Sequence, residues 1–525
     1  MNINSITPKI ENRNLKNDIQ QPKFGNGLDT FLRFLDTNKA WGATGVDLGS
    51  MVIPRTMVDF SRGVNAGIET GVRETSSSGN HAAIGLYGAG AGALLAAAYD
   101  SKYGVKFNKI FACDKLLNNL ASNWDENKEL KPYLEKVVGS IEGFNPSRGT
   151  ADGWVGLDKE TQKLIVDKLE YEIRNVDGYK INKNTEKYIH NIITSKTGAE
   201  TQIRLKDAKA GVEGLELKNV IENIFSVTKS FMKDKVGQAF ESAKNVDANE
   251  YIKSLKRFNK MRSLAGVGIG AAVGMSIQPI NRYLTKKRTG SDDFVGGGEK
   301  DNSLKFKLIK TAAAIAFLAG AFATISTNPK EIIPKLQFKG MTPTLDQYKA
   351  VYGLTIFSRF MSSRNGNELG EGARKDTIGF TTWLLLGNIV SKAYIKLRDK
   401  DLLNYQPNKG LLKANIKTRD EVLLEALNRH GISVAEDGKA LKFRELMKKL
   451  PSNDKLTRVK LRKLNAAQVV GYLFSGLILG VGIPQMNKHL TNKKEAKKKA
   501  ALEAQAQAAQ NVLLNRPANE ISKAA

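Results

Sequence analysis

The chain has 525 residues, of which 41% are hydrophobic, and its mean hydropathy is −0.33. This balance excludes a protein embedded in a membrane over most of its length and leaves room for about two to four domains. The formal net charge is +28, which predicts an anionic partner, either lipid or nucleic acid. Because the basic residues cluster beside apolar segments, we expect a lipid bilayer with anionic headgroups, and not nucleic acid.

The cysteine and histidine content limits which disulfides and metal sites this chain can form. The single cysteine, Cys113, excludes an intramolecular disulfide. Neither a metal-ligand spacing nor a nucleotide-phosphate or serine-hydrolase motif is present, so we expect no metal, no cofactor and no enzymatic activity. The first 26 residues have no apolar core, so no cleavable signal peptide is expected. The histidines lie far apart: His81, His190, His430 and His489.

Five uncharged apolar segments are the strongest structural signal. A helix that crosses a bilayer needs about 20 residues, and four of the segments reach that length. The fourth reaches it only if Lys392 extends its ammonium group to the lipid surface. The alternative for each segment is a buried helix of a soluble core. The segments are residues 75–99, 263–281, 311–329, 377–391 and 464–487.

The remaining chain reads as polar helical regions and connections. Apolar residues at three- and four-residue spacing predict helices in the two long polar stretches. The predicted order begins with a disordered leader (1–26), an interfacial segment with the first apolar helix (27–100) and a polar helical domain (101–262). The second and third apolar helices follow, with a flexible linker at 289–303 (263–329), and then a loop with the fourth apolar helix (330–392). The chain continues with a second polar helical domain (393–463), the fifth apolar helix (464–487) and a charged helical tail (488–525).

One stretch of the sequence occurs twice in the chain. Residues 255–287 align without a gap to residues 461–493, and nine positions are identical, including Asn281 with Asn487. Both copies have a basic entry, an apolar helix with glycines four residues apart and a basic exit, which is the layout of a membrane-spanning helix. The sequence therefore predicts an internal duplication.

A weaker match extends the duplication. Phe-Ser-Arg followed by Gly, Glu, Gly, Arg and Thr occurs at 60–75 and, with gaps, at 357–377. The first and second apolar segments would then correspond to the fourth and fifth. An offset of three spans predicts two halves of opposite orientation, the plan of many secondary transporters. The match also groups polar residues that we expect to form ion pairs at a helix entrance: Arg62, Glu69, Arg73, Arg359, Glu371 and Arg374.

Small residues four apart lie on one face of a helix and let helix backbones approach closely. Their spacing predicts helix–helix packing, because glycine inside a helix costs about 1 kcal/mol against alanine unless contacts compensate. The predicted packing residues are Gly88, Gly92, Gly266, Gly270, Gly274, Gly476 and Gly480.

A dinucleotide-binding turn is the strongest rival interpretation of the first apolar segment. Gly88, Gly90 and Ala93 would be its small positions, and Asp114 would be the acid that binds ribose. This hypothesis requires a strand immediately before Gly88.

The favoured interpretation is a mainly α-helical, multi-span membrane protein with an internal duplication and large polar helical segments. Its expected role is that of a membrane scaffold or interaction protein of a plasma or inner membrane, open to self-association. The alternatives are a transporter or channel built from two inverted halves, and a soluble dinucleotide-binding or other helical protein.

Overall fold

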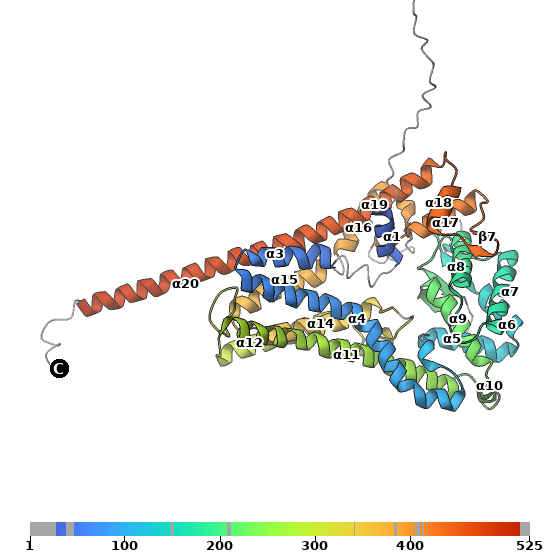
Figure 1. Ribbon diagram of the computed structural model, residues 1–525, viewed down its shortest axis with the longest axis horizontal. Helices are drawn as coiled ribbons and strands as arrows, with labels where there is room; N and C mark the ends of the chain where they lie inside the picture. Colours follow the sequence, from blue (N-terminus) through green and yellow to red (C-terminus); the bar gives the residue numbers. More distant parts are fainter. Residues whose placement is uncertain are drawn as a thin grey trace, which may run out of the picture.

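The computed structural model describes residues 28–37, 47–148, 152–206, 212–340, 342–382, 386–404, 410–411 and 414–514. Helix accounts for 75% of the structure, so the mainly helical fold class is confirmed. Long helices form an elongated bundle, with shorter helices and strands grouped at one end and a single helix projecting from the other (Figure 1). The predicted leader at 1–26 lies outside the described residues.

The bundle consists of long helices and two segments that contain π-helical turns. It contains η1 (Leu48–Val52) with α3 (Ile53–Phe60), α4 (Val64–Tyr103), α11 (Glu250–Thr289), α12 (Leu304–Ala323), α14 (Leu345–Met361), α15 (Gly366–Thr381) with α16 (Gly387–Arg398), and α19 (Lys455–Ser475), which continues through η7 (Gly476–Gly482) into α20 (Ile483–Leu514). The short α13 (Pro329–Lys335) joins α12 to α14.

Four helices in the described part of the chain are long and apolar enough to cross a membrane: α4, α11, α12 and the continuous helix at 455–511. They contain three of the five predicted apolar segments whole, and α12 contains residues 311–323 of the segment predicted at 311–329. The other predicted segment, 377–391, includes residues 383–385, which lie outside the described residues, and its flanks belong to α15 and α16.

Local sequence sets where these helices begin and end. Asn249 caps α11 by accepting hydrogen bonds from two backbone N–H groups of its first turn, and Gly290, with a φ of +73°, ends it. Gly63, with a φ of +138°, separates α3 from α4, and this conformation is open only to glycine without strain. The chain can therefore reverse between α3 and α4 within a few residues.

The segment at 28–60, predicted as interfacial, forms two helical parts. Its first part, α1 (Leu28–Thr37), packs against the short-helix end of the molecule, where Arg33 forms two 2.7 Å hydrogen bonds with Asp420. Its second part, η1 with α3, lies inside the bundle beside α4 and η7, and Arg55 is 3% exposed. Arg33 and Arg55 of this segment therefore have acidic partners inside the protein.

The main elements of the bundle can be divided into two groups of three. We call η1–α3, α4 and α11 the first unit, and α14, α15–α16 and α19–α20 the second unit. In both units the second element runs toward the short-helix end and the third runs back from it (Figure 1). Helix α14 runs parallel to α11, since Gly270 lies against Val351 and Arg282 donates to the Ser362 carbonyl.

The two units therefore point the same way, whereas inverted halves need opposite directions. The sequence analysis counted only apolar segments, which placed the corresponding helices of the two units three helices apart. It left out α14, because α14 carries Asp346, Lys349 and Arg359 and its hydropathy does not mark it as part of the bundle. With α14 included the offset becomes even. The inverted arrangement is a prediction that this geometry corrects.

The first apolar segment contains no dinucleotide-binding turn. Gly88, Gly90 and Ala93 lie within α4, which is helical for more than twenty residues before Gly88. Asp114 is the first residue of α5, and its carboxylate accepts a 3.0 Å hydrogen bond from Gln337. The dinucleotide hypothesis is therefore wrong, because neither the required strand nor a strand end beside Asp114 exists.

Each predicted packing glycine in the two long repeated helices, and each in α4, faces a neighbouring element. A Cβ atom added at Gly266 would lie 2.8 Å from the Gly88 Cα atom, closer than such atoms approach. Because this contact involves backbone, no rotamer change can relieve it. The neighbours are Phe338 for Gly88, Arg262 for Gly92, Gly88 for Gly266, Ile84 and Val351 for Gly270, Asn80 and Thr355 for Gly274, Ser50 for Gly476, and Ser50 and Pro54 for Gly480.

Two alanine substitutions in α11 test this packing. Gly266→Ala should destabilise the protein, because the new methyl group meets the backbone of α4. Gly268→Ala, on the exposed face with nothing within 4 Å, should stabilise it by up to about 1 kcal/mol through helix propensity. Thermal unfolding of the purified protein measures both, and equal shifts of the same sign would contradict close packing of α4 and α11.

The short-helix end holds two polar domains. The first, residues 107–249, contains η2 (Phe107–Lys109), α5 (Asp114–Asn127), α6 (Leu130–Gly139), β1 (Ile141–Phe144), η3 (Pro146–Arg148), β2 (Trp154–Gly156), α7 (Lys159–Asn175), α8 (Lys183–Thr197), β3 (Ile203–Leu205), β4 (Val212–Leu215), α9 (Leu217–Phe231) and α10 (Asp234–Glu241). Its strands form an antiparallel sheet in the order β2-β1-β3-β4. Its hydrophobic core is continuous with the ends of α4 and α11, through residues such as Tyr103 and Phe258.

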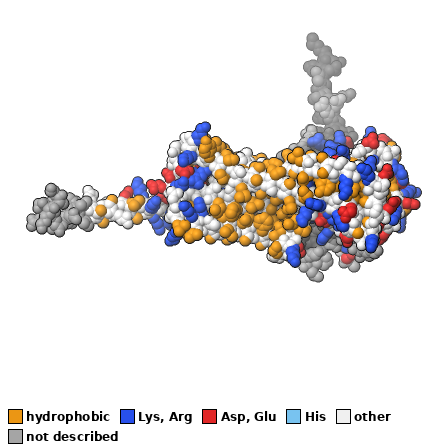
Figure 2. Space-filling model, turned by 90° about the horizontal axis from the view of Figure 1, so that it is seen from below, with side chains coloured by type: hydrophobic (Ala, Val, Ile, Leu, Met, Phe, Trp, Pro, Cys, Tyr) orange, Lys and Arg blue, Asp and Glu red, His pale blue; other side chains and the backbone are white. Residues whose placement is uncertain are grey.

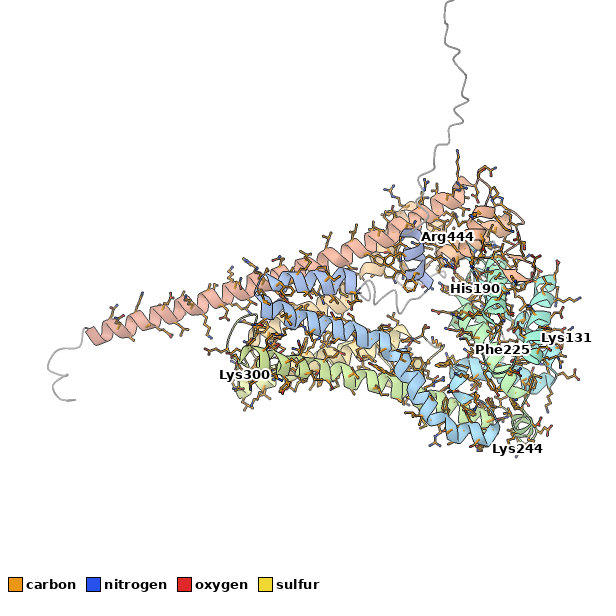
Figure 3. All side chains as sticks on the ribbon, in the orientation of Figure 1. Lys131, His190, Phe225, Lys244, Lys300 and Arg444 are labelled. Atoms are coloured by element: carbon orange, nitrogen blue, oxygen red, sulfur yellow. The ribbon has the colours of Figure 1, made fainter. Side chains whose placement is uncertain are left out.

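The second polar domain, residues 399–454, is smaller and packs on the first. It contains η5 (Lys400–Leu402), β5 (Leu403–Asn404), β6 (Asn415–Ile416), α17 (Arg419–Arg429), β7 (Ala435–Glu436), β8 (Lys439–Ala440) and α18 (Phe443–Lys449). Helix α17 lies against α8. At this contact the Glu421 carboxylate accepts a 2.6 Å hydrogen bond from the Glu200 backbone N–H, and His190 Nε2 lies 3.6 Å from Glu200 Oε1 (Figure 3).

Two groups at this interface have raised pKa values. Burial, with the charge of Glu200, raises the pKa of Glu421 to about 7. Burial opposes the charged form of His190, yet its hydrogen bond to Glu200 raises the pKa of that imidazole above its ordinary value. Since both folded-state values exceed the unfolded ones, both groups stabilise the fold most when protonated, and this contribution is lost as pH rises to about 7 and above.

We therefore expect the unfolding temperature to fall between about pH 5 and pH 8, and Glu200→Gln to flatten that fall. The substitution keeps the side-chain shape and removes the charge that raises both pKa values. Glu170→Gln, at an exposed ion pair of α7, is the control. An unchanged slope in the Glu200 variant would contradict the assignment.

Candidate functional site

Charged side chains gather inside the bundle, between the two units. Glu74 of α4 is 6% exposed, and four cationic groups surround its carboxylate. The distances to its oxygens are 3.4 Å from Arg55, 3.1 Å from Arg73, 3.6 Å from Arg359 and 2.8 Å from Lys375. Arg359 also donates a 3.1 Å hydrogen bond to Asp376. We call these six residues the Glu74 cluster.

Two further ion pairs exchange partners between the units. Arg62, which follows α3 of the first unit, donates to Glu371 in α15 of the second, with one hydrogen bond of 2.8 Å. Arg364, which precedes α15 of the second unit, donates a 2.6 Å hydrogen bond to Glu69 in α4 of the first. Each unit therefore supplies an arginine to a glutamate of the other.

The third element of each unit fixes these glutamates through an asparagine. Asn281 of α11 donates a 2.9 Å hydrogen bond to the Glu69 carbonyl, and Asn487 of α20 donates a 3.1 Å hydrogen bond to the Glu371 carbonyl. Asn281 and Asn487 are one of the identical pairs in the repeated stretch. Asparagine is required at this point because its amide supplies a donor for a buried carbonyl without adding charge.

Most of these groups border one small polar cavity of about 60 Å³, and Glu74, Arg364 and Asn281 lie outside its lining. The first unit contributes α3, α4 and Gln278 of α11, the second contributes α14, α15 and the start of α20, and the loop at 294–296 is also part of the lining. Of the polar residues that the sequence predicts, five line this cavity: Arg62, Glu69, Arg73, Arg359 and Glu371. The sequence predicts ion pairs at the start of one helix. In the structure these ion pairs lie between the N-terminal parts of two helices, α4 and α15.

Two predicted positions need correction. Arg374 is not part of the cavity lining, and its guanidinium donates a 2.7 Å hydrogen bond to Asn487 instead. Arg359 was matched with Arg62, yet Arg364 makes the contact equivalent to that of Arg62. The cause is the gapped alignment, which took the wrong serine–arginine pair in the second copy.

The sequence analysis missed several members of the Glu74 cluster and of the exchanged ion pairs. A gap-free alignment could have found most of them. Residues 61–75 align to 363–377 without a gap, and this register pairs Arg62 with Arg364 and Glu69 with Glu371. It also pairs Arg73 with Lys375 and Glu74 with Asp376. The missed residues are Arg55, Glu74, Arg364, Lys375 and Asp376. No sequence signal marks Arg55, which stands in η1–α3 outside the matched stretch.

The outer surface of the bundle has the opposite character. Figure 2 shows hydrophobic side chains over the middle of the bundle, with Lys and Arg concentrated toward both ends. Leu94 and Leu86 of α4 are 87% and 69% exposed, and Leu308 of α12 is 64% exposed. Charged groups are therefore buried and large apolar groups are exposed over the same length of helix.

Comparison with protein-family models, with curated proteins and with solved structures gives no match. Within the described residues, no group of three His, Cys, Asp or Glu side chains is arranged to hold a metal ion.

The exchanged pairs predict a large stability effect inside the bundle. Glu371→Gln should destabilise the protein by about 2 kcal/mol or more, because it removes the closer of two counter-charges from the buried Arg62 guanidinium and leaves only Asp59, at 3.5 Å. Glu170→Gln removes one partner of an exposed pair and should cost about 0.5 kcal/mol or less. Thermal unfolding in detergent measures both.

The reversed pair Arg62→Glu with Glu371→Arg is the matching control. It should recover part of the stability that either single change removes, since opposite charges again face each other. If Glu371→Gln costs no more than Glu170→Gln, the exchanged pair does not hold the units together.

Proposed function

We propose that this chain is a multi-pass integral membrane protein of the scaffold type, built from two duplicated units that hold a pair of polar domains on one side of a bilayer. The observation that carries the proposal is the reversal of polarity in the bundle. Ion pairs occupy its interior, and exposed leucine and isoleucine side chains cover its exterior. In water such a surface would be costly, whereas lipid is its natural solvent.

Basic residues at both ends of the bundle support this role. One end of α11 carries Lys256, Arg257 and Lys260, and the other carries Lys286, Lys287 and Arg288. The 40 residues of α11 extend for about 60 Å, twice the thickness of a hydrocarbon core of about 30 Å, so both basic groups can reach anionic headgroups. The host membrane would be a plasma or inner membrane.

The duplication is supported by matched contacts as well as by matched residues. The same asparagine in each unit binds the backbone of the same glutamate, and the same arginine crosses to the other unit. Since one unit alone would expose half of each ion pair, both must be present for the interior to be neutralised. The protein purified for the unfolding measurements also serves to measure self-association of the whole chain.

A scaffold explains the geometry better than a conduit. The polar space between the units is about 60 Å³, which is room for a few water molecules and not for a passage along the bundle. The large polar domains, in contrast, form a continuous folded body at one end. We infer that binding other molecules through these domains is the main role.

Carbonate extraction of membranes from expressing cells tests the central claim, and the protein should remain in the pellet. Its recovery in the aqueous fraction would overturn the proposal.

Cysteine labelling tests the sidedness. In a Cys113→Ser background, Lys244→Cys in the first polar domain and Lys300→Cys at the far end of the bundle should be labelled from opposite sides of sealed vesicles (Figure 3). Both should react after detergent is added. Labelling of both from one side would contradict a bilayer between them.

A further inference from the structure

A groove opens on the surface where α4 meets the first polar domain (Figure 1). Its volume is about 740 Å³, within the range of about 300–1,000 Å³ that small-molecule sites occupy. The last turns of α4, the connection to η2 and η2 itself contribute its lining. That lining combines small apolar residues of α4, such as Ala93 and Ala97, with the charged residues Asp100, Lys106 and Lys109.

The groove lies at one edge of the apolar outer surface of the bundle. It begins at Ala93, next to Leu94, which is 87% exposed. Helix α11 runs antiparallel to α4 here, and Gly92 of α4 lies against Arg262 of α11. The basic residues of α11 at 256–260 are therefore level with the groove. In a bilayer this is the level at which headgroups meet the hydrocarbon layer.

Positive charge exceeds negative charge in the lining. The charged residues that line the groove are Lys106, Lys109 and Asp100. Lys106 lies 3.7 Å from Asp100, whose carboxylate also accepts a 2.9 Å hydrogen bond from the Phe107 backbone N–H. Within the part of the chain that the structure describes, Lys109 has no carboxylate within ion-pair distance. One ammonium group of the lining is thus left without a counter-charge.

A third lysine and an unpaired acceptor lie at the same place. Lys235 of α10 donates a 3.4 Å hydrogen bond to the carbonyl of Ser101, which lines the groove. Asp234, the neighbour of Lys235 in the chain, is not part of the lining. Asn108, which is part of it, has a buried side-chain oxygen without a partner, and a headgroup hydroxyl or a water molecule can donate to it.

The alanine residues of α4 add an apolar surface to the same groove. Ala93 and Ala97 are exposed and follow one another by one helical turn. Because an alanine side chain ends at its Cβ atom, these residues leave space along the helix. A hydrocarbon chain can fill that space and bury apolar surface.

We propose that this groove binds one anionic phospholipid, with its phosphate group between Lys106 and Lys109 and an acyl chain along Ala93 and Ala97. Basic pockets beside membrane-spanning helices suit such headgroups, because fixed ammonium groups meet the phosphate there. Since α4, η2 and α10 all reach the groove, the bound lipid strengthens the junction between the bundle and the first polar domain. The inference rests on the proposed membrane role and adds a specific lipid site to it.

Phosphatidylglycerol is the probe for the test. The full chain, purified in a neutral detergent, is titrated with phosphatidylglycerol or with phosphatidylcholine, and the unfolding temperature is followed. We expect a saturable rise with phosphatidylglycerol that exceeds the rise with phosphatidylcholine. Equal stabilisation by the two lipids would overturn the proposal. An equal rise with water-soluble glycerol phosphate would assign the groove to a free phosphate compound and would overturn it as well.

A matched pair of charge variants separates this groove from general attraction to a basic surface. Lys109→Gln should raise the dissociation constant of phosphatidylglycerol by about fivefold. Lys260→Gln removes the same charge at the same level, outside the lining, and should leave that constant nearly unchanged. Equal effects of the two changes would contradict a defined site.

A second matched pair fills space without changing charge. Ala97→Phe should abolish the preference for phosphatidylglycerol, because the ring occupies the groove. Ala98→Phe, also exposed but outside the lining, should preserve that preference. Both residues are exposed, so neither change disturbs the core. A preference that survives in both variants would show that the lipid binds elsewhere.

The carbonate and lipid results are read separately. A protein that stays in the pellet and shows no preference for phosphatidylglycerol keeps the membrane role and loses the lipid site. Recovery in the aqueous fraction overturns both.

Discussion

The exchange of arginine–glutamate pairs between the two units is the constraint on which the bundle depends. Arg62 reaches Glu371, and Arg364 reaches Glu69, so each unit holds a charge of the other. Each arginine also pairs with an acid beside it in the chain, Asp59 for Arg62 and Glu368 for Arg364. Moving two such ions from water into a protein interior costs several kcal/mol each, and only close pairing offsets that cost. The requirement fixes the register of α4 against α15, because a shift of one helical turn would separate both pairs at once.

The asparagines of α11 and α20 tie the third element of each unit to the same point. Their hydrogen bonds reach the carbonyls of the two exchanged glutamates, so six elements meet around one charged centre. Close packing at Gly266 and Gly480 then sets how near the neighbouring backbones come. Electrostatics thus determine which residues meet, and glycine determines the distance between the helices.

Sequence predicted the helical class, the apolar helices and the repeated asparagine, because periodicity and identity are local properties. It also predicted five of the polar residues that border the cavity. The direction of the second unit could not be predicted from hydropathy, since the charges of α14 are neutralised by partners such as Glu74 that are distant in the chain. Four members of the Glu74 cluster were missed for the same reason: Arg55, for example, acquires its role only when separate segments fold together.

The length of α4 and α11 has a mechanical consequence. Each helix has 40 residues and extends for about 60 Å, and the ends of both are built into the core of the first polar domain through Tyr103 and Phe258. The antiparallel pair therefore joins the bundle directly to the domain core. A tilt of about 10° in the bundle would move the far end by about 10 Å over that length. Load applied to the polar domains would be transmitted directly to the contact between the two units.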